Sequence, residues 1–363
     1  MKKSRKIIFY FLFCILLFII FTLVWANNVK APIWTFEFIQ SESDVSEENL
    51  LENVPEKTTS IIFGGDVMLS RVVGQKMVKY NDFSWPLKDV SPTMLSADIS
   101  VINLESPFTI GLKSYTVPTG SFSFNADPKS ILALKTAGVD LVSLANNHFG
   151  NQGKKGMQDT FTLLNENNIT YVGAGLDSDE AHSYKELYAN DSKFCFLGYA
   201  YPSDLYVSGI SSPGIASMDQ DVMAKNVQTA RASCDSVIVM MHAGIEYVNK
   251  PNMQQKNFAR AAIDAGADLV IGHHPHWVQV TEIYQGKPIL YSLGNLVFDQ
   301  MWSRETAQGA LAKVVYKGNT IKEIEIIPIE IVDYGKAVLA GESVSKEIIN
   351  RMELSDRFIK INQ

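Results

Sequence analysis

The stretch GADLVIGHHPHWVQ, residues 266–279, carries three of the chain's six histidines, His273, His274 and His276. The apolar run before them predicts a buried strand, and the histidines begin where that strand ends. In α/β proteins, binding sites form at the carboxyl ends of strands. A solvated turn with inert imidazoles is the alternative interpretation, but the position after a strand favours a metal or proton-transfer site.

Four other apolar runs carry, at or near their ends, a side chain that can bind a metal or transfer a proton. They are SIIFGGDVM with Asp66, DISVINLE with Glu105, VDLVSLANNH with Asn147 and His148, and DSVIVMMH with His242. For a single run, a capping asparagine or a loop carboxylate is the simpler explanation. Five such runs in order are better explained by one centre, in which carboxylates, an amide and imidazoles converge on metal ions.

The alternation of these strands with helical segments predicts one α/β domain over residues 59–340. Helices are expected at about 128–137, 154–167, 218–232 and 252–265. The last strands follow one another without helices between them, which predicts antiparallel or mixed pairing there. Residues 341–363 are expected to form a C-terminal segment.

The N-terminus predicts a membrane anchor. Residues 7–26 contain no charge and follow four basic residues, Lys2, Lys3, Arg5 and Lys6. A helix of that length spans about 30 Å, the thickness of a bilayer core. Residues 1–26 are therefore expected to form a cytoplasmic basic end and a single transmembrane helix, with the domain outside the cell. A cleaved signal peptide is the alternative, although its apolar core is usually only about 7–15 residues long.

The composition limits the partners of the part outside the membrane. Residues 27–58 are rich in acids and predict a solvated stalk. Without the four N-terminal basic residues, 28 basic residues stand against 39 acidic ones, a net charge of −11. Such an acidic protein is a poor nucleic-acid binder, so an anionic substrate would need local cations such as metal ions. Cys195 and Cys234 are expected to be buried free thiols, with a bridge between them as the alternative.

Six blocks of the sequence resemble those of the CapA family of capsule-synthesis proteins, which is associated with poly-γ-glutamate production. The blocks are GGDVMLSR, INLESPFT, SLANNHFGNQG, HAGIEY, GHHPHWVQ and YSLGNLVFD, and they span about residues 60–300. That family is similar to the calcineurin-like metallophosphoesterases. The resemblance implies a four-layer α/β/β/α metallophosphoesterase-like sandwich, with the site at one edge of the sheets.

The resemblance also implies a role for each matched residue. One divalent ion (Mn, Zn or Fe) is expected at Glu105, Asn147, His242 and His274, and a second at Asp66, the shared Glu105 and His276. His148 matches a proton donor next to Asn147, and His273 lies beside the ligands. One departure concerns Met68, which stands where the superfamily places a histidine ligand. Because a thioether is a poor ligand for such cations, occupancy by two ions is an open question.

Further candidates are expected around this centre. Arg71, Glu246, Tyr247 and His273 are assigned to substrate binding, with an ion pair as the alternative for Arg71 and a structural role for the pair 246–247. Asp299 is expected to cap a helix, and His182 to lie on the surface.

Together these features predict an anchored, extracytoplasmic, metal-dependent hydrolase that acts in synthesis, export or attachment of an anionic capsule polymer of the poly-γ-glutamate type. No ATP-binding motif is found in the sequence, so a membrane-bound capsule ligase and export subunits are the expected partners. Two alternatives stay open. One is a non-catalytic polymer-binding scaffold with a degenerate metal site, and the other is a secreted phosphodiesterase or nucleotidase unrelated to capsule.

Overall fold

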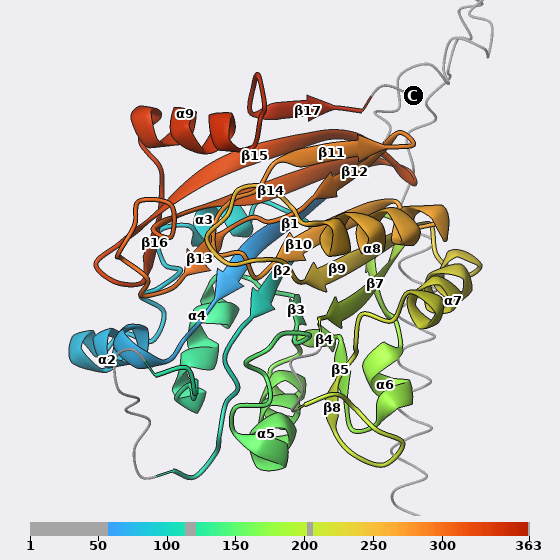
Figure 1. The fold of residues 1–363 in the computed structure, drawn as a ribbon. Helices are drawn as coiled ribbons and strands as arrows, with labels where there is room; N and C mark the ends of the chain where they lie inside the picture. Colours follow the sequence, from blue (N-terminus) through green and yellow to red (C-terminus); the bar gives the residue numbers. More distant parts are fainter. Residues whose placement is uncertain (1–56, 113–120, 202–205, 362–363) are drawn as a thin grey trace, which may run out of the picture. The chain divides into compact units, whose positions relative to one another are not determined.

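Two β-sheets lie face to face in the computed structural model, which describes residues 57–112, 121–201 and 206–361 (Figure 1). The first sheet runs in the order β16 (Lys336–Leu339), β15 (Thr320–Val332), β14 (Gln308–Lys317), β1 (Thr58–Val67), β2 (Ile99–Leu104), β3 (Leu141–Ser143) and β4 (Thr170–Val172), with β13 (Asn295–Val297) paired to β1 and β17 (Phe358–Lys360) paired to β15. The second runs β11 (Thr281–Tyr284), β12 (Lys287–Leu290), β10 (Leu269–His273), β9 (Ser236–His242), β7 (Ser192–Ala200) and β6 (Lys185–Ala189). A short separate pair joins β5 (Ala174–Gly175) to β8 (Gly214–Ile215).

Helices cover the outer face of each sheet. The first sheet is covered by α2 (Arg71–Tyr80), α3 (Ser91–Met94), α4 (Ile131–Thr136), which follows a short 3₁₀ turn at Pro128–Ser130, and α5 (Gly153–Glu166). The second is covered by α6 (Ser178–His182), α7 (Gln220–Arg231) and α8 (Met253–Asp264). Figure 1 shows α7 and α8 on the opposite side of the sheets from α4 and α5.

Three hydrophobic clusters fill the spaces between these layers, because the buried strands are apolar on both faces. In β1, Ile62 packs toward the helices of the first sheet, whereas Ile61 and Phe63 pack between the two sheets. In β9, Ile238 lies between the sheets, and Val239 packs under α7 and α8. The expected α/β class, with two stacked sheets between outer helices, is therefore confirmed.

The described part of the expected C-terminal segment, residues 341–361, packs on the sheets. It contains α9 (Glu342–Arg351) and β17. Ile348 and Met352 of this segment lie in the hydrophobic cluster between the sheets, and β17 pairs with β15. The predicted antiparallel pairing of the late strands is confirmed for β14, β15 and β16.

The expected anchor at residues 7–26 and almost all of the expected stalk at 27–58 lie outside the described residues. Within the described ranges, no helix has both the length and the apolar character needed to cross a bilayer.

A disulfide joins Cys195 of β7 to Cys234, just before β9, with the two Cα atoms 6.0 Å apart. The expectation of two free thiols is therefore wrong, and the bridged alternative is correct. The strands explain the pairing, because β7 and β9 are parallel neighbours whose register places Cys195 opposite Val237.

Candidate metal centre

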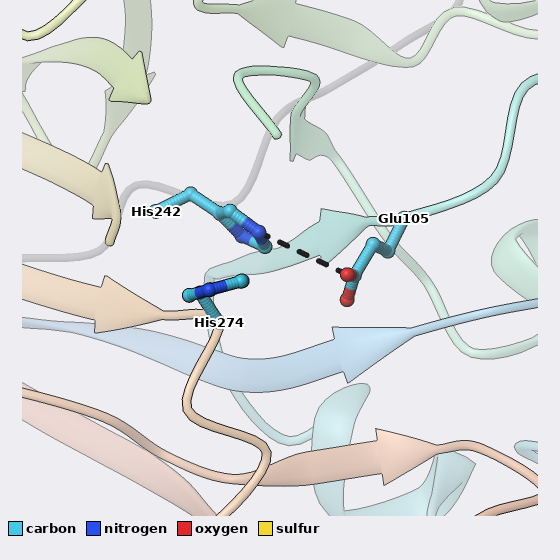
Figure 2. Close-up of side chains that lie close together, drawn as sticks. All are labelled: Glu105, His242 and His274. Atoms are coloured by element: carbon cyan, nitrogen blue, oxygen red, sulfur yellow. Dashed lines mark ion pairs between the residues drawn. The ribbon is translucent and has the colours of Figure 1, made fainter. Parts of the chain in front are cut away.

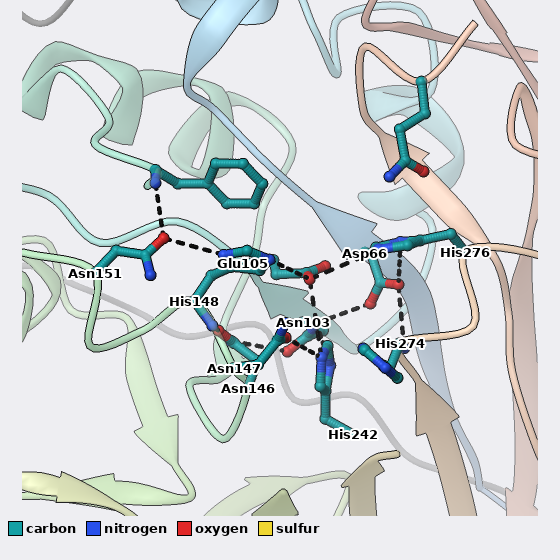
Figure 3. Close-up of polar contacts among 12 residues, drawn as sticks. Asp66, Asn103, Glu105, Asn146, Asn147, His148, Asn151, His242, His274 and His276 are labelled. Atoms are coloured by element: carbon teal, nitrogen blue, oxygen red, sulfur yellow. Dashed lines mark hydrogen bonds and ion pairs between the residues drawn. The ribbon is translucent and has the colours of Figure 1, made fainter. Parts of the chain in front are cut away.

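The predicted site residues meet at one edge of the two sheets. Asp66, Glu105 and the pair 147–148 lie at or just after the ends of β1, β2 and β3, which are parallel neighbours in the first sheet. His242 ends β9 and the run 273–276 ends β10, which are parallel neighbours in the second sheet. The centre is therefore assembled from both sheets, as the close-up in Figure 3 shows.

A local irregularity in β1 positions Asp66. The pairing of β1 with β2 shifts register between Phe63 and Asp66, at the two glycines 64 and 65. A Cβ atom on Gly65 would collide with the carbonyl oxygen of Gly294. This close approach lets the Asp66 amide donate to the same Gly294 carbonyl at 3.0 Å. The GG of GGDVM is thus needed for packing next to the first ligand.

Glu105 lies opposite His242 and His274 (Figure 2). Its side chain is fully buried, and neither carboxylate oxygen has a hydrogen-bond partner. Three imidazoles approach its Oε1 through their Nε2 atoms, at 3.8 Å from His242, 3.9 Å from His148 and 4.0 Å from His276. These distances are too long for hydrogen bonds. They leave space between the ligand atoms, as a shared cation requires.

Burial raises the pKa of Glu105 well above its usual value, and the charges of Asp66 and Glu246 raise it further. A buried carboxylate without hydrogen bonds is costly unless a cation pairs with it. Carboxylates, imidazoles and an amide oxygen are ligands for divalent transition metals. The residues present therefore fit a divalent metal ion.

Two groups of potential ligands share Glu105. One combines it with His242 and His274, and the other with Asp66 and His276, with the ligand atoms of each group within 4.8 Å of one another. Asn147 joins the first group, because its Oδ1 lies 2.8 Å from Nε2 of His242. These are the two sets that the resemblance implied.

Asp66 is held as a carboxylate. Its Oδ1 accepts from Asn103 at 2.8 Å, and its Oδ2 accepts from the backbone amide of His274 at 3.2 Å. Burial alone would raise the pKa of Asp66, but the hydrogen bond and charge of His276 outweigh it and hold this pKa well below its usual range.

His148 is fixed by an aromatic ring and an amide. It stacks on Phe124, with the ring centroids 3.9 Å apart. Its Nδ1 lies 3.0 Å from Oδ1 of Asn151, which also accepts from the Phe124 amide at 2.7 Å. An oxygen that accepts from the backbone must also accept from the imidazole, so Nδ1 carries a proton and Nε2 faces Glu105. Burial lowers the pKa of His148 to about 4.

The histidines after β10 separate into different roles. His274 and His276 adopt positive φ angles of 96° and 57°, which turn the chain so that both side chains point into the centre. His273, expected to bind substrate, is buried in β10, and its Nε2 donates to the Gly64 carbonyl at 3.2 Å. It therefore connects the second sheet to the irregular part of β1.

The remaining predicted substrate-binding residues lie around this centre. Arg71 is only 5% exposed and forms a two-point ion pair with Asp299, beneath the rings of Phe124 and Phe298. The structure thus places Arg71 in an ion pair, which was the alternative, although a buried one. Asp299 accepts from the Val72 amide at 3.1 Å, close to its expected role as a cap.

Glu246 and Tyr247 lie half-buried beside the ligands. Burial lowers the pKa of His274 to about 4, and the negative charge of Glu246 opposes this shift. The same charge adds to the effect of burial in raising the pKa of Glu105. The Tyr247 ring stacks near His276, with the centroids 6.2 Å apart. His182 is far from this group in α6, half-buried, with its Nδ1 on the Ser178 carbonyl.

Met68 does not point to a vacant ligand position. It is fully buried in the cluster under α2, and its sulfur accepts from the Ser70 amide at 3.0 Å. Packing as a flexible core side chain accounts for both contacts.

Four asparagines that the sequence did not single out orient the predicted ligands. Asn103 donates to Asp66 and lies 3.2 Å from Nδ1 of His242. Oδ1 of Asn295 accepts from Nδ1 of His276 at 2.9 Å. Asn146 and Asn151 hold the loop and the ring of His148. All four lie inside or next to the quoted blocks, but an asparagine after a strand is also a common turn residue.

Comparison with known proteins gives one family. Residues 60–300 match the model described as "Bacterial capsule synthesis protein PGA_cap". The chain is similar to the capsule biosynthesis protein CapA of Bacillus anthracis, with 34% identity over 276 residues, or 74% of this chain and 66% of that protein, just under two thirds of its length. It is also similar to the PGA biosynthesis protein CapA of Bacillus subtilis, with 30% identity over 354 residues, which cover 96% of this chain and 87% of that protein.

Among solved structures, a hypothetical protein from Thermus thermophilus is similar, with a TM-score of 0.49 and 17% identity. The match covers 75% of this chain and all of that one.

Proposed function

The chain belongs to the bacterial capsule synthesis protein family, and from that membership we propose that it acts in synthesis, export or attachment of an anionic capsule polymer of the poly-γ-glutamate type. We further propose that it does so as a metal-dependent hydrolase that is anchored in the cell membrane and faces the outside. The names of the two Bacillus relatives, both capsule or PGA biosynthesis proteins, support the first part.

The observation that carries the hydrolase proposal is the environment of Glu105. Both of its oxygens are buried and without a hydrogen-bond partner, and three imidazole nitrogens surround one of them at 3.8–4.0 Å. A structural carboxylate would be expected to have hydrogen-bond donors. Glu105 would be shared by the two ligand groups that could hold a cation, one with Asp66 and His276 and the other with His242 and His274.

The roles of the residues follow from their contacts. A divalent ion in this position supplies Lewis-acid polarisation of the substrate and lowers the pKa of water. The chain holds the other participants: Asn103 and Asn295 orient the ligands, and Asn147 lies beside His242. His148 directs an unprotonated Nε2 toward the centre because Asn151 accepts from its Nδ1, so His148 can pass a proton to a leaving group only after Nε2 has taken one up.

The location outside the cell rests on two independent features. The charge-free run at residues 7–26 follows four basic residues, as in an anchor with a cytoplasmic N-terminus. The Cys195–Cys234 bridge is typical of oxidising compartments. A polymerising ligase and export subunits in the same membrane are the proposed partners, and the polyanion would be attracted by bound cations because the chain itself is acidic.

Metal content and activity of the full-length protein in detergent test the proposal together. We expect at least one tightly bound divalent ion and hydrolysis of an activated phosphodiester that stops on chelation. Glu105→Gln, which removes the shared charge but keeps the shape, should abolish both. A wild-type protein that binds metal but hydrolyses no ester would contradict the enzyme. One without metal would contradict the centre.

A scaffold without catalysis is the second candidate, and the packing of Met68 favours it. A histidine introduced by Met68→His would replace a core side chain and leave an imidazole in the apolar cluster. We expect it to cost about 1–3 kcal/mol of stability without raising the metal content per chain. Elemental analysis and thermal unfolding check this. A gain of one ion per chain would instead show that residue 68 is close enough to act as a ligand.

A further inference from the structure

A loop beside the metal centre presents a tryptophan to solvent. Trp302, on the connection between β13 and β14, is 62% exposed. The loop is held in place, because Thr306 donates through Oγ1 to the Gln300 carbonyl at 2.6 Å, and Asn295 donates to the Thr306 carbonyl at 2.9 Å. A single exposed apolar side chain needs no explanation. An indole on a loop fixed by buried hydrogen bonds is different, because its position is determined before any ligand arrives.

Tyr247 connects this indole to the metal centre. Its ring makes an edge contact with Trp302, with the centroids 5.7 Å apart, and it stacks near His276 at 6.2 Å. The backbone of Tyr247 has a positive φ of 63°, a conformation that is unfavourable for residues other than glycine. Gln300 donates to the Tyr247 hydroxyl at 3.4 Å and accepts from Asn295, which also holds His276. We call Tyr247 and Trp302 the aromatic platform.

A cavity of about 540 Å³ lies beside Trp302, one of the two residues of the aromatic platform. Its lining includes Trp302 itself, the apolar Met301 and Ile331, and the polar side chains of Ser303, Gln308 and Glu330. A pocket with an aromatic wall and a few polar groups is the usual form of a small-molecule site.

The charges around this cavity are either ion-paired or negative, since the lining also includes the carboxylate of Glu330. The Arg304 guanidinium is ion-paired with Glu347 at 2.7 Å, and the Asp333 carboxylate is paired with Lys76. A polyanion needs unpaired cations along its path, and the lining residues do not offer them. An uncharged ring with one C–H face and hydroxyl groups on its edge fits this cavity better than a polyanion does. The C–H face can stack on the indole, and the hydroxyl groups can form hydrogen bonds with the polar side chains.

We propose that the aromatic platform and its cavity bind a sugar ring of an uncharged glycan beside the metal centre. This binding is independent of hydrolysis, since none of its contacts uses a metal ligand directly. It places a carbohydrate next to the site at which an anionic polymer would be processed.

The test measures binding of two uncharged oligosaccharides, cellotetraose and chitotetraose, to the full-length protein in detergent with a chelator present. At least one should bind and quench tryptophan fluorescence. Trp302→Ala should weaken that binding about tenfold or more, and Trp302→Phe should retain part of it. Tyr188→Ala is the matched control, because Tyr188 is also exposed, at 66%, but lies on β6.

Three results would overturn the proposal. They are no binding of either tetrasaccharide to the wild type, equal binding to Trp302→Ala, and Trp302-dependent binding of a γ-glutamate oligomer in place of the sugars. Trp302→Gln serves as a second variant should alanine disturb the loop. Because chelator is present throughout, loss of the hydrolase proposal would leave this result unchanged, and failure here would leave the metal proposal standing.

Discussion

At the scale of single residues, the centre depends on side chains that are costly to bury without a cation. Glu105 has its pKa raised by burial, whereas burial lowers the pKa of His242 well below its usual value. Both shifts favour the neutral forms in the metal-free protein. A bound cation reverses the preference at Glu105, so metal binding is expected to release a proton.

His242→Ala should remove most of the bound metal. The substitution deletes an imidazole from the group with Glu105 and His274 and leaves Asn147 without its neighbour, so affinity should fall by orders of magnitude. Elemental analysis after dialysis measures it. His182→Ala, in α6 and away from the centre, is the control and should keep its metal. Equal metal content in a folded His242→Ala protein would exclude this residue as a ligand.

His148 predicts a pH dependence of the chelated protein. Its folded pKa of about 4 lies below the ordinary value of 6.5, so the unfolded chain binds more protons between these values. Its contribution to stability is complete above pH 6.5 and is lost as the pH falls toward about 4. Thermal unfolding of His148→Gln should therefore depend less on pH in this window than that of the wild type, whereas His182→Gln should behave like the wild type. Parallel curves for all three would refute the assignment.

The ligand types could be predicted from the sequence, but the residues that orient them could not. Asp66, Glu105 and His242 stood out because each ends an apolar run. Asn103 and Asn295 carry no such signal, since their partners are distant in the chain and an asparagine also occurs commonly in turns. Only the register of β1 with β2, which places Asp66 opposite Asn103, brings the pair together.

At the scale of elements, the long apolar strands and amphipathic helices followed their patterns. The predicted helix at 154–167 is α5, Gly153–Glu166, and that at 252–265 is α8, Met253–Asp264. Four of the described helices were not predicted, the short α3 and α6 and the longer α2 and α9. In α2 and α9 the buried side chains are few, namely Arg71, Val73 and Met77 in one and Ile348 in the other. Their apolar and polar side chains are nevertheless separated on opposite faces as clearly as those of α5 and α8, so the sequence does carry a helical pattern at both places.

Gly65→Ala tests how β1 positions the centre. The added methyl would collide with the Gly294 carbonyl and push β1 away from the connection to β13. We expect a loss of at least about 1–3 kcal/mol in stability, together with reduced metal content because Asp66 moves. Gly341→Ala is the matched control, since a Cβ there meets open space. Normal metal content in Gly65→Ala would show that Asp66 does not depend on this contact.

At the scale of the whole molecule, the Cys195–Cys234 disulfide bears on both the stability of the protein and its proposed location outside the cell. It closes a loop with a sequence separation of 39, for which chain entropy predicts about 4 kcal/mol of stabilisation. Reductant should lower the unfolding midpoint of the wild type but not that of a Cys195→Ala/Cys234→Ala protein. Without reductant, thiol alkylation of protein from intact cells should leave both residues unmodified. Modification of both would contradict the bridge and the proposed location.

The division of the ligands between the two sheets has a mechanical consequence. Asp66 and Glu105 belong to the first sheet, and His242 and His274 follow strands of the second. Ions shared by these groups would cross-link the two sheets at this edge, in addition to the hydrogen bond from His273 to the Gly64 carbonyl. Local separation of the two sheets at this edge would then be suppressed in the metal-bound protein. Amide hydrogen exchange at the carboxyl ends of β1 and β9 would slow on loading, while the far ends of the same strands would keep their rates.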